Sequence, residues 1–352
     1  MKAMVMTATG GPEVLQPAEL PVPEIVDPHQ IRVRLRAAGI NPIDTKLRER
    51  GVFYPDALPA ILGCDGAGEV EAVGDAVTRF RPGDRVWFCN GGLGGAPGNY
   101  AEYTVVDEHV ARVMPQTLDY AEAAAGPLVL ITAWEALVDR AGIEPGDRVL
   151  IHAGAGGVGH VAIQLARHFG ARVATTVGSA EGAAIARELG AEYIINYHET
   201  DFVHAIDEWS AGDGAHIVLD TVGGETFGRS IEATAHYGDL VTLLDPGSGV
   251  DWREARNRNL RIGFELMLTP MLRDLHGRPC PSGRDPGPLC RAHRRGDIAP
   301  AGTGPLPARR GCRRPPAAGR GTHAGETGAA ALRARATGVV PGRHPGVMCA
   351  PP

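Results

Sequence analysis

Three glycines, Gly154, Gly156 and Gly159, have the spacing of a turn that holds a diphosphate. They follow the apolar run "RVLIHA" and precede the amphipathic stretch "HVAIQLARHF", so the turn would join a strand to a helix. In such a G-x-G-x-x-G turn the first glycine permits the tight bend, the second lets the backbone approach a pyrophosphate, and the third lets the helix pack on the strand. The helix start adds unpaired N–H groups and the positive end of its dipole. The pattern predicts a dinucleotide site.

The strand after this turn indicates which dinucleotide is bound. Sites selective for NAD usually carry Asp or Glu at the end of the second strand, where the acid binds the ribose hydroxyls. Here that strand ends in Thr175-Thr176-Val177-Gly178-Ser179, which is neutral. A 2′-phosphate would not be repelled there, and Ser179 could hydrogen-bond to it, although no Lys or Arg stands beside Ser179. The sequence therefore favours NADPH over NADH.

The elements that must position these residues fall into two regions. Residues 1–120 are β-rich: "IRVRLRAAG" alternates apolar residues with arginines at a period of two, and Gly, Pro and Asp separate the later strands. From residue 121, strand-length apolar runs alternate with helical patterns, which is typical of a parallel, doubly wound α/β sheet with right-handed crossovers. The segment "NLRIGFELM" at 259–267 is the predicted sixth strand. We expect a β-rich domain at 1–120 and a dinucleotide-binding domain at 121–270.

Composition narrows the classes of function. The chain has 352 residues and a net charge of −6, and residues 1–272 hold 21 basic against 37 acidic groups, which disfavours a nucleic-acid partner. No apolar stretch is long enough to span a bilayer, and the first residues lack the apolar core of a signal peptide. None of the six cysteines forms a C-x-x-C pair. We therefore expect a cytoplasmic protein without a disulfide framework and without a membrane partner.

The last region, 271–352, departs from these patterns. From residue 273 on it holds 14 Arg against 4 acidic residues and lacks Phe, Tyr, Trp, Lys, Asn and Gln. A segment of this composition buries too little apolar surface to offset its ordering entropy, so we expect an aberrant, disordered tail. A frameshift near codon 276 of a GC-rich gene is our favoured explanation, and a natural disordered tail is the alternative. Sequencing the gene across that codon separates the two.

Several motifs together resemble one enzyme family. "GAGEVEAVG" at 66–74, "RPGDRVW" at 81–87, "LITAWEAL" at 130–137 and "HAGAGGVG" at 152–159 resemble the medium-chain dehydrogenase/reductase superfamily. Within it, "AAGINPIDTKLR" and "YIINY" look like the zinc-independent quinone oxidoreductases, the zeta-crystallin-like branch. The resemblance covers residues 1–272 and implies a GroES-like catalytic domain, a Rossmann domain and, often, a homodimer. In that architecture the C-terminal segment completes the catalytic domain, which residues 271–352 put in doubt.

The same comparison argues against a metal. Zinc-dependent relatives place a Cys before the segment held here by "NPID" and a His-Glu where this chain has Cys64-Asp65. The third ligand would fall near "PLVLITAW", which has no Cys, His or carboxylate before Glu135. Since a catalytic zinc requires three protein ligands, Cys64 with Asp65 or Asp44 is an incomplete set. We predict no metal site and interpret Cys64 as a small buried hydrophobe.

The resemblance also implies roles for individual residues. Asn41 and Asp44 match the cleft motif and would orient the acceptor, and Thr132 matches a residue beside the nicotinamide. Ser179 and Tyr197 match positions that line the adenosine 2′-phosphate site, and Thr221, Val222 and Gly223 end the fourth strand of the second domain. The full predicted set of cofactor-binding residues is Gly154, Gly156, Gly157, Val158, Gly159, Thr176, Ser179, Tyr197, Thr221, Val222, Gly223 and Leu244.

These features predict an NADPH-dependent, zinc-free reductase. Without a Lewis acid an alkoxide is not stabilised, whereas a quinone or a related conjugated carbonyl delocalises the incoming charge by itself. One alternative is an enoyl or alkenal double-bond reductase, which needs a placed proton donor. Another is a non-catalytic NADP(H)-binding protein crippled by its tail, and an alcohol dehydrogenase is the third.

Overall fold

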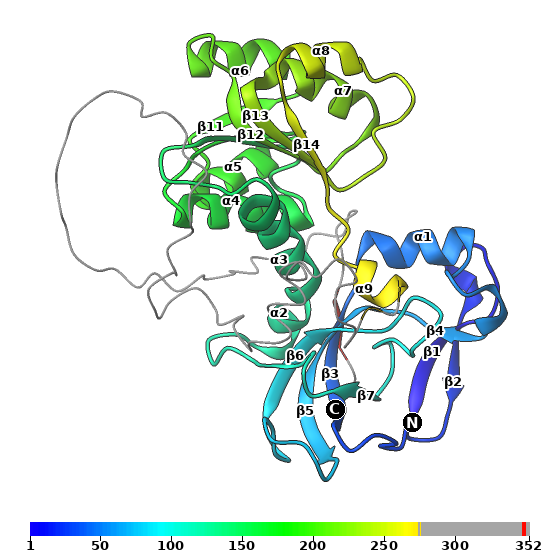
Figure 1. Cartoon of the computed structure of the whole chain (residues 1–352). Helices are drawn as coiled ribbons and strands as arrows, with labels where there is room; N and C mark the ends of the chain where they lie inside the picture. The colour runs from blue at the N-terminus through cyan, green and yellow to red at the C-terminus, as the bar shows by residue number, and fades with distance from the viewer. Residues whose placement is uncertain (274, 276–346, 350–352) are drawn as a thin grey trace.

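The structure is a computed structural model that describes residues 1–273, 275 and 347–349. Figure 1 shows two lobes, with the blue and cyan N-terminal strands in the lower one and most of the green and yellow-green elements in the upper one. The α/β fold expected from the sequence is confirmed, with antiparallel sheets in one lobe and a parallel sheet in the other. The predicted domain limits of 120 and 270 stay predictions.

The first lobe is built from antiparallel strands. A three-stranded sheet has the order β2-β1-β4, and a second sheet has the order β15-β3-β5-β6-β8 with β7 paired to β3, where β15 spans Val347–Cys349. The alternation predicted at 31–39 is real, because Ile31, Val33 and Leu35 of β3 are buried. The strands are β1 (Lys2–Met6), β2 (Leu15–Glu19), β3 (Gln30–Gly39), β4 (Ala60–Ile61), β5 (Asp65–Val73), β6 (Arg85–Cys89), β7 (Tyr103–Asp107) and β8 (Arg112–Val113). The helical segments are η1 (Pro12–Val14), α1 (Pro42–Arg50) and η2 (Pro55–Ala57).

The second lobe holds a six-stranded, all-parallel sheet in the order β11-β10-β9-β12-β13-β14. This is the doubly wound order in which the strand sequence reverses beside the first strand, β9. The strands are β9 (Arg148–Ile151), β10 (Arg172–Val177), β11 (Tyr193–Asn196), β12 (Ala215–Asp220), β13 (Thr234–Thr242) and β14 (Arg261–Phe264). The helices are α4 (Gly157–His168), α5 (Ala180–Glu188), α6 (Phe202–Ser210), α7 (Gly224–Ala233) and α8 (Trp252–Asn257).

Helices cover both faces of this sheet. Val149 and Ile151 of β9 pack into a core with α4, whereas Leu150 between them packs into a core with α6 and α7. Alternate residues of a strand point to opposite faces, so a fully buried strand is an uninterrupted apolar run. This arrangement explains the strand-length apolar runs in the sequence.

Two connections run between the lobes. The first comprises α2 (Tyr120–Ala124), α3 (Pro127–Trp134) and a π-helical turn, η3 (Glu135–Arg140). The second leaves β14 and reaches α9 (Thr269–Leu272), drawn in yellow in Figure 1 beside the first lobe. Met267 and Leu268 of this second connection are buried in the core of the first lobe, together with Met6 and Leu62. The chain therefore returns to its first lobe before residue 273.

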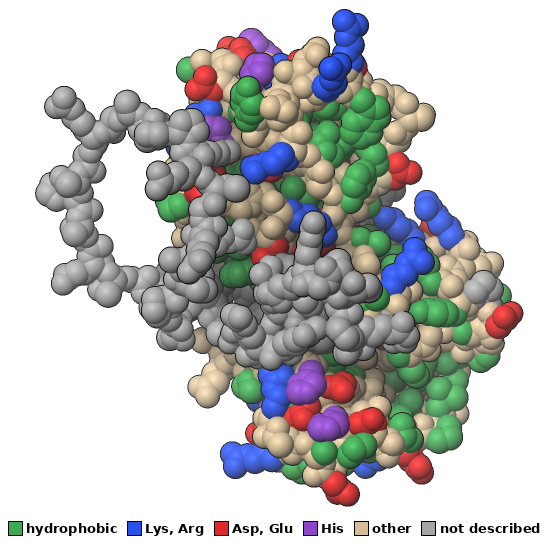
Figure 2. Space-filling view, viewed as in Figure 1, with side chains coloured by type: hydrophobic (Ala, Val, Ile, Leu, Met, Phe, Trp, Pro, Cys, Tyr) green, Lys and Arg blue, Asp and Glu red, His purple; other side chains and the backbone are tan. Residues whose placement is uncertain are grey.

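Within the tail, the structure describes one strand, β15 (Val347–Cys349), which pairs antiparallel with β3. The rest of the tail predicted to be disordered, and the proposed frameshift site near codon 276, lie outside the described residues. In the described part of the chain, no helix is long and apolar enough to cross a membrane. On the face shown in Figure 2, Lys and Arg side chains are dispersed among acidic and apolar ones over both lobes.

Candidate functional site

The glycine turn joins β9 to α4 as predicted, and its three glycines meet different surroundings. A Cβ on Gly154 would lie 2.1 Å from Oγ1 of Thr175, and one on Gly159 would lie 2.1 Å from the Ala153 carbonyl oxygen. A Cβ on Gly156 would meet nothing closer than that same oxygen, at 3.1 Å. The first and third glycines are therefore required by packing, while the second borders more open space.

The start of α4 supplies the donors that a diphosphate needs. Gly156 is the N-cap and makes no side-chain cap, so the N–H groups of Gly157 and Val158 lie at an uncapped helix start. The first N–H groups of a helix have no partner within it, and the helix dipole adds partial positive charge there. The turn therefore combines a glycine that leaves space for a ligand with unpaired backbone N–H donors at a helix start. This combination fits the pyrophosphate of a dinucleotide.

A buried histidine shapes this turn from behind. His152 is 1% exposed, and its ring nitrogens lie 3.2 Å from Oγ1 of Thr176 and 2.9 Å from Oγ of Ser230. The same Thr176 hydroxyl accepts the N–H of Ala153 at 3.0 Å. Burial lowers the pKa of His152 to about 4, so the ring is neutral at pH 7. Thr176 thus supports the turn from inside, and its predicted contact with the cofactor stays a prediction.

Exposed apolar side chains lie at the carboxyl ends of three of the parallel strands. Tyr197 follows β11, Val222 follows β12, and Phe264 and Leu266 lie at the end of β14, with 54, 47, 56 and 51% of their surfaces exposed. Open α/β sheets bind ligands at the carboxyl ends of their strands, next to the point where the strand order reverses. Phe264 and Leu266 were missed in the sequence, although both lie in the segment predicted as the sixth strand.

The residues predicted to bind the 2′-phosphate lie close together at the end of β10. A Cβ on Gly178 would lie only 2.3 Å from the phenol oxygen of Tyr197, so that hydroxyl reaches the end of β10. Ser179 is the N-cap of α5, and its Oγ accepts the N–H of Gly182 at 3.1 Å. The structure brings Gly178, Ser179 and Tyr197 together at the end of β10, as the predicted site requires.

The loop after β12 is held by a buried acid. Asp220 is fully buried and accepts the N–H groups of Val222 at 2.9 Å and Gly223 at 3.0 Å. Gly223 has a φ of 77°, and a Cβ on it would lie 3.0 Å from that of Leu244. Thr221, Val222, Gly223 and Leu244 are therefore neighbours at this edge, beside the end of β9, where the hydroxyl of Thr221 donates to the carbonyl of His152 at 2.8 Å.

The predicted catalytic residues are joined by an acid that the sequence did not single out for this role, Asp65. Its Oδ2 accepts Nδ2 of Asn41 at 2.9 Å, and its Oδ1 accepts the N–H of Leu128 at 3.0 Å. The carbonyl of Leu128 in turn accepts the hydroxyl of Thr132 at 2.7 Å. Asp65 thus connects the start of α1 to α3, and the predicted residues Asn41 and Thr132 belong to one hydrogen-bonded chain.

Asp44 extends this chain toward Tyr100. Its Oδ2 accepts the backbone N–H of Asn41 at 2.7 Å and the hydroxyl of Tyr100 at 2.8 Å. Burial raises the pKa of Asp44 and raises that of Asp65 to about 7, although the hydrogen bond from Asn41 opposes the rise at Asp65. Burial and the nearby Asp44 also raise the pKa of Tyr100. The phenol is therefore a hydrogen-bond donor at neutral pH.

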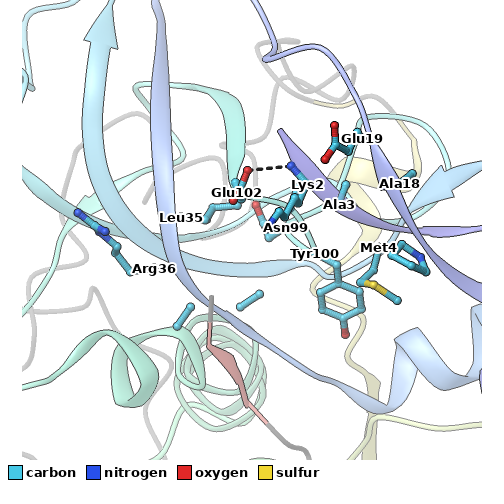
Figure 3. A pocket seen from close by; sticks show the side chains of 14 residues that line it. Lys2, Ala3, Met4, Ala18, Glu19, Leu35, Arg36, Asn99, Tyr100 and Glu102 are labelled. Atoms are coloured by element: carbon cyan, nitrogen blue, oxygen red, sulfur yellow. Dashed lines mark hydrogen bonds between the residues drawn. The ribbon is translucent and has the colours of Figure 1, made fainter. Parts of the chain in front are cut away.

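Tyr100 also lines an open, mostly apolar groove that belongs to the first lobe. Figure 3 shows Tyr100 and Asn99 in this groove beside Met4 and Ala18, with the backbone N–H of Lys2 bonded to Glu102. The glycine turn contributes no residue to its lining, so the groove is separate from the predicted cofactor site.

The zinc-ligand positions considered in the sequence hold a different set of side chains. Cys64 is fully buried in the core of the first lobe, and Cys64 and Cys89 are free cysteines. Both carboxylate oxygens of Asp65 are already bonded to Asn41 and Leu128. Among the residues that the structure describes, no group of three or more His, Cys, Asp or Glu side chains could hold a metal ion.

Known proteins resemble this chain over both lobes. Residues 27–116 match the family described as the alcohol dehydrogenase GroES-like domain, and residues 157–247 match the one described as zinc-binding dehydrogenase. The quinone oxidoreductase of Pseudomonas aeruginosa is 39% identical over 247 residues, which make up 69% of this chain and 73% of that protein.

Two solved structures resemble it as well. A mycobacterial protein complexed with NADPH is 33% identical with a TM-score of 0.69, over 76% of this chain and 83% of that one. A 2-haloacrylate reductase is 32% identical with a TM-score of 0.66, over 77% of this chain and 82% of that one.

Proposed function

Because the chain belongs to the quinone oxidoreductase branch of the medium-chain dehydrogenase/reductase superfamily, we propose that this oxidoreductase is zinc-free and uses NADPH to reduce a quinone or a related conjugated carbonyl. The family uses a nicotinamide cofactor and a small-molecule substrate. The choice of NADPH, the acceptor and the absence of zinc are our proposals. The homodimer and the cytoplasmic location inferred from the sequence stay predictions.

One observation carries the proposal: the residues predicted to orient the acceptor form a polar chain that needs no metal. Asp65 bonds both to Asn41 and to the backbone that anchors Thr132. The side chain of Asn41 is an amide rather than a zinc ligand, and its buried nitrogen is taken by Asp65. Such a site can position a carbonyl acceptor, to which the second N–H of the Asn41 amide can donate, but it offers no cation to stabilise an alkoxide.

The protein's share of the reaction is binding and orientation. When bound, a reduced nicotinamide supplies the hydride. Gly157 and Val158 would hold the diphosphate, and Val222, Phe264 and Leu266 would present an apolar surface to the planar rings. Tyr100 and Asp44 hold the N-terminus of α1 so that Asn41 keeps one orientation. A preorganised site of this kind reduces the entropy lost on reaching the reactive geometry.

The preference for NADPH rests on the end of β10. Val177, Gly178 and Ser179 carry no negative charge, and the hydroxyls of Ser179 and Tyr197 are available to an anion. The similar mycobacterial structure was solved with NADPH, which supports the same choice. A 2′-phosphate there would gain hydrogen bonds without a repelling carboxylate.

The second candidate function is reduction of an activated carbon–carbon double bond. The similarity to a 2-haloacrylate reductase favours it, and Tyr100 is a protonated phenol that Asp44 links to the backbone N–H of Asn41. This reaction needs a proton at the substrate carbon, so it requires a donor that a quinone does not need.

Steady-state turnover with NADPH and NADH, each with a panel of quinones and enones, tests these assignments. We expect quinones to give the highest kcat/KM and NADPH to be preferred. Preferred turnover of enones would favour the second candidate, and stoichiometric zinc in the purified protein would overturn the metal-free proposal. Tight NADPH binding without turnover of any acceptor would indicate the non-catalytic alternative. Parallel assays on a chain with a repaired reading frame would show whether residues 271–352 limit activity.

A further inference from the structure

Two buried acids lie where the two connections between the lobes meet. Glu135 begins the π-helical turn η3 of the first connection, and Glu265 directly follows β14 in the second. They are 8 and 3% exposed, and 130 residues separate them in the chain. π-Helical turns within helices are frequent at functional sites. Neither acid was assigned a role in the proposed function.

Each of these acids holds a buried oxygen that lacks a donor. The carboxyl group of Glu265 contacts that of Glu135, and Oε1 of each is buried with no hydrogen-bond partner among the described residues. Oε2 of Glu265 accepts Nε of Arg140 from the same turn η3. Two ionised carboxylates are both acceptors only and cannot bond to each other. A proton held by one of the two carboxyl groups would supply a donor to the other and would leave one negative charge for Arg140.

We propose that Glu135 and Glu265 share a proton and, with Arg140, form a carboxyl latch that positions Phe264 and Leu266 at the nicotinamide end of the cofactor site. These are positioning residues, since nothing assigns them a contact with the substrate. The proposal rests on the proposed function only in placing the nicotinamide at this edge. The latch itself is a property of the protein without ligand.

The neighbourhood of Glu265 explains why its side chain can position this segment. Its N–H donates to the carbonyl of Thr242 at 2.9 Å, which continues the pairing of β14 with β13. A Cβ on Gly263 would lie 3.6 Å from Cδ of Arg140, so the stem of Arg140 packs against β14 just before the exposed Phe264. Beyond Glu265, Met267 enters the core of the other lobe. The latch thus links η3, through polar side chains, to the segment that leads from β14 to the core of the first lobe.

Charges around the pair agree with a retained proton. Burial, the contact with Glu265 and the charge of Asp139 raise the pKa of Glu135 to about 9, and Arg140 opposes them. The acids of the strands that pack on η3 are engaged elsewhere: Asp220 with Val222 and Gly223, and Asp239 with Arg261. Above pH 9, two adjacent buried carboxylates would face one guanidinium, and their repulsion would loosen the segment that carries Phe264 and Leu266.

The first test measures stability, which needs no nucleotide. The folded protein keeps a proton on Glu135 that the unfolded chain releases near the ordinary pKa of a glutamate. The free energy of unfolding therefore falls as pH rises toward 9. Relative to Glu135→Gln, which keeps the shape and a donor but cannot ionise, the folding equilibrium constant of the wild type should fall about tenfold per pH unit between pH 6 and 9. Urea unfolding midpoints measure this difference. Parallel profiles for the two proteins would overturn the shared proton.

The second test measures NADPH binding by fluorescence titration between pH 7 and 10.5. We expect the dissociation constant of the wild type to rise above pH 9 and that of Glu135→Gln to stay level, while Glu135→Ala binds more weakly at every pH. Glu232→Gln, an exposed site on α7, is the matched control and should follow the wild type. Identical pH profiles for the wild type and Glu135→Gln would overturn the positioning role. If no variant binds nicotinamide, the proposed function fails, and the stability test still decides the shared proton.

Discussion

At the scale of single residues, the three glycines of the turn do different work. Gly154 and Gly159 have backbone or side-chain atoms within 2.1 Å of any added Cβ, so their replacement disturbs packing. A Cβ on Gly156 would lie 3.1 Å from the Ala153 carbonyl oxygen, a contact that a shift of a few tenths of an ångström relieves, so its replacement should largely spare the fold and act on the ligand. The division matches the roles that the sequence motif predicts.

Gly156→Asp should abolish dinucleotide binding. A like charge about 4 Å from a phosphate costs about 4 kcal/mol at a protein surface, or about a thousandfold in affinity. Fluorescence titration with NADPH measures the loss, and the thermal unfolding midpoint should change little. Gly156→Ala is the uncharged control and should lose much less affinity. Undiminished affinity in the Asp variant would mean that the phosphates bind elsewhere.

Tyr197→Ala should weaken NADPH more than NADH. Its hydroxyl lies beside Gly178 and Ser179, where only NADPH would carry a phosphate. Loss of one hydrogen bond to a charged group corresponds to about 1.5–3 kcal/mol, or roughly ten- to a hundredfold in the dissociation constant. Tyr197→Phe isolates the hydroxyl. An equal loss for the two nucleotides would contradict the phosphate assignment.

At the scale of elements, Asp65 is the junction between β5, α1 and α3. The side chain of Asn41 and the backbone of Leu128 both donate to it, so the ends of two helices depend on one carboxylate. Buried donors that lose their acceptor retain their full desolvation cost. This dependence makes Asp65 harder to replace without loss of stability than Glu71, the exposed acid of the same strand.

Asp65→Ala should lower the free energy of unfolding by at least about 2 kcal/mol, because two buried donors lose their acceptor. Asp65→Asn keeps an acceptor oxygen and should cost less. Urea denaturation measures both. Activity should fall further than stability in the Asn variant, since its amide can accept from only one of the two donors. A stable, fully active Ala variant would contradict the positioning role of Asp65.

At the scale of the whole molecule, buried acids with raised pKa values should make the folded protein more stable at mildly acidic pH than at alkaline pH. Glu135 and Asp65 have pKa values of about 9 and about 7, so the folded state binds protons that the unfolded state releases. Stability held by such groups is lost as pH rises. His152, with its pKa lowered to about 4, acts oppositely, but only below the ordinary pKa of histidine.

The free energy of unfolding should therefore rise by about 1.4 kcal/mol for each pH unit from 9 down to 7, where Glu135 alone titrates between its folded and unfolded values. Below pH 7 Asp65 adds to the gain, and below about 6.5 His152 opposes it. Urea unfolding at pH 5, 7 and 9 measures the trend. A lower stability at pH 7 than at pH 9 would contradict the buried, protonated state of Glu135.

Local patterns were sufficient to predict much of the fold. The alternation in β3, the parallel strands from β9 to β14 and the glycine turn between β9 and α4 all match the sequence interpretation. Each is encoded by neighbours in the chain, because burial repeats with the period of the element and a tight turn requires particular residues in succession. The strand-level prediction therefore needed no knowledge of which distant segments meet.

The order of residues along the chain was sufficient to predict the set of elements, the dinucleotide turn and the candidates Asn41, Asp44 and Thr132. The way they are held became visible only in the folded chain: Asp65 bonds to Asn41, 24 residues away, and Glu135 contacts Glu265, 130 residues away. Periodicity indicates that a polar side chain is buried, but not which remote donor or acid it meets. That choice depends on how the lobes and their two connections pack, and it sets the charge and orientation of the site.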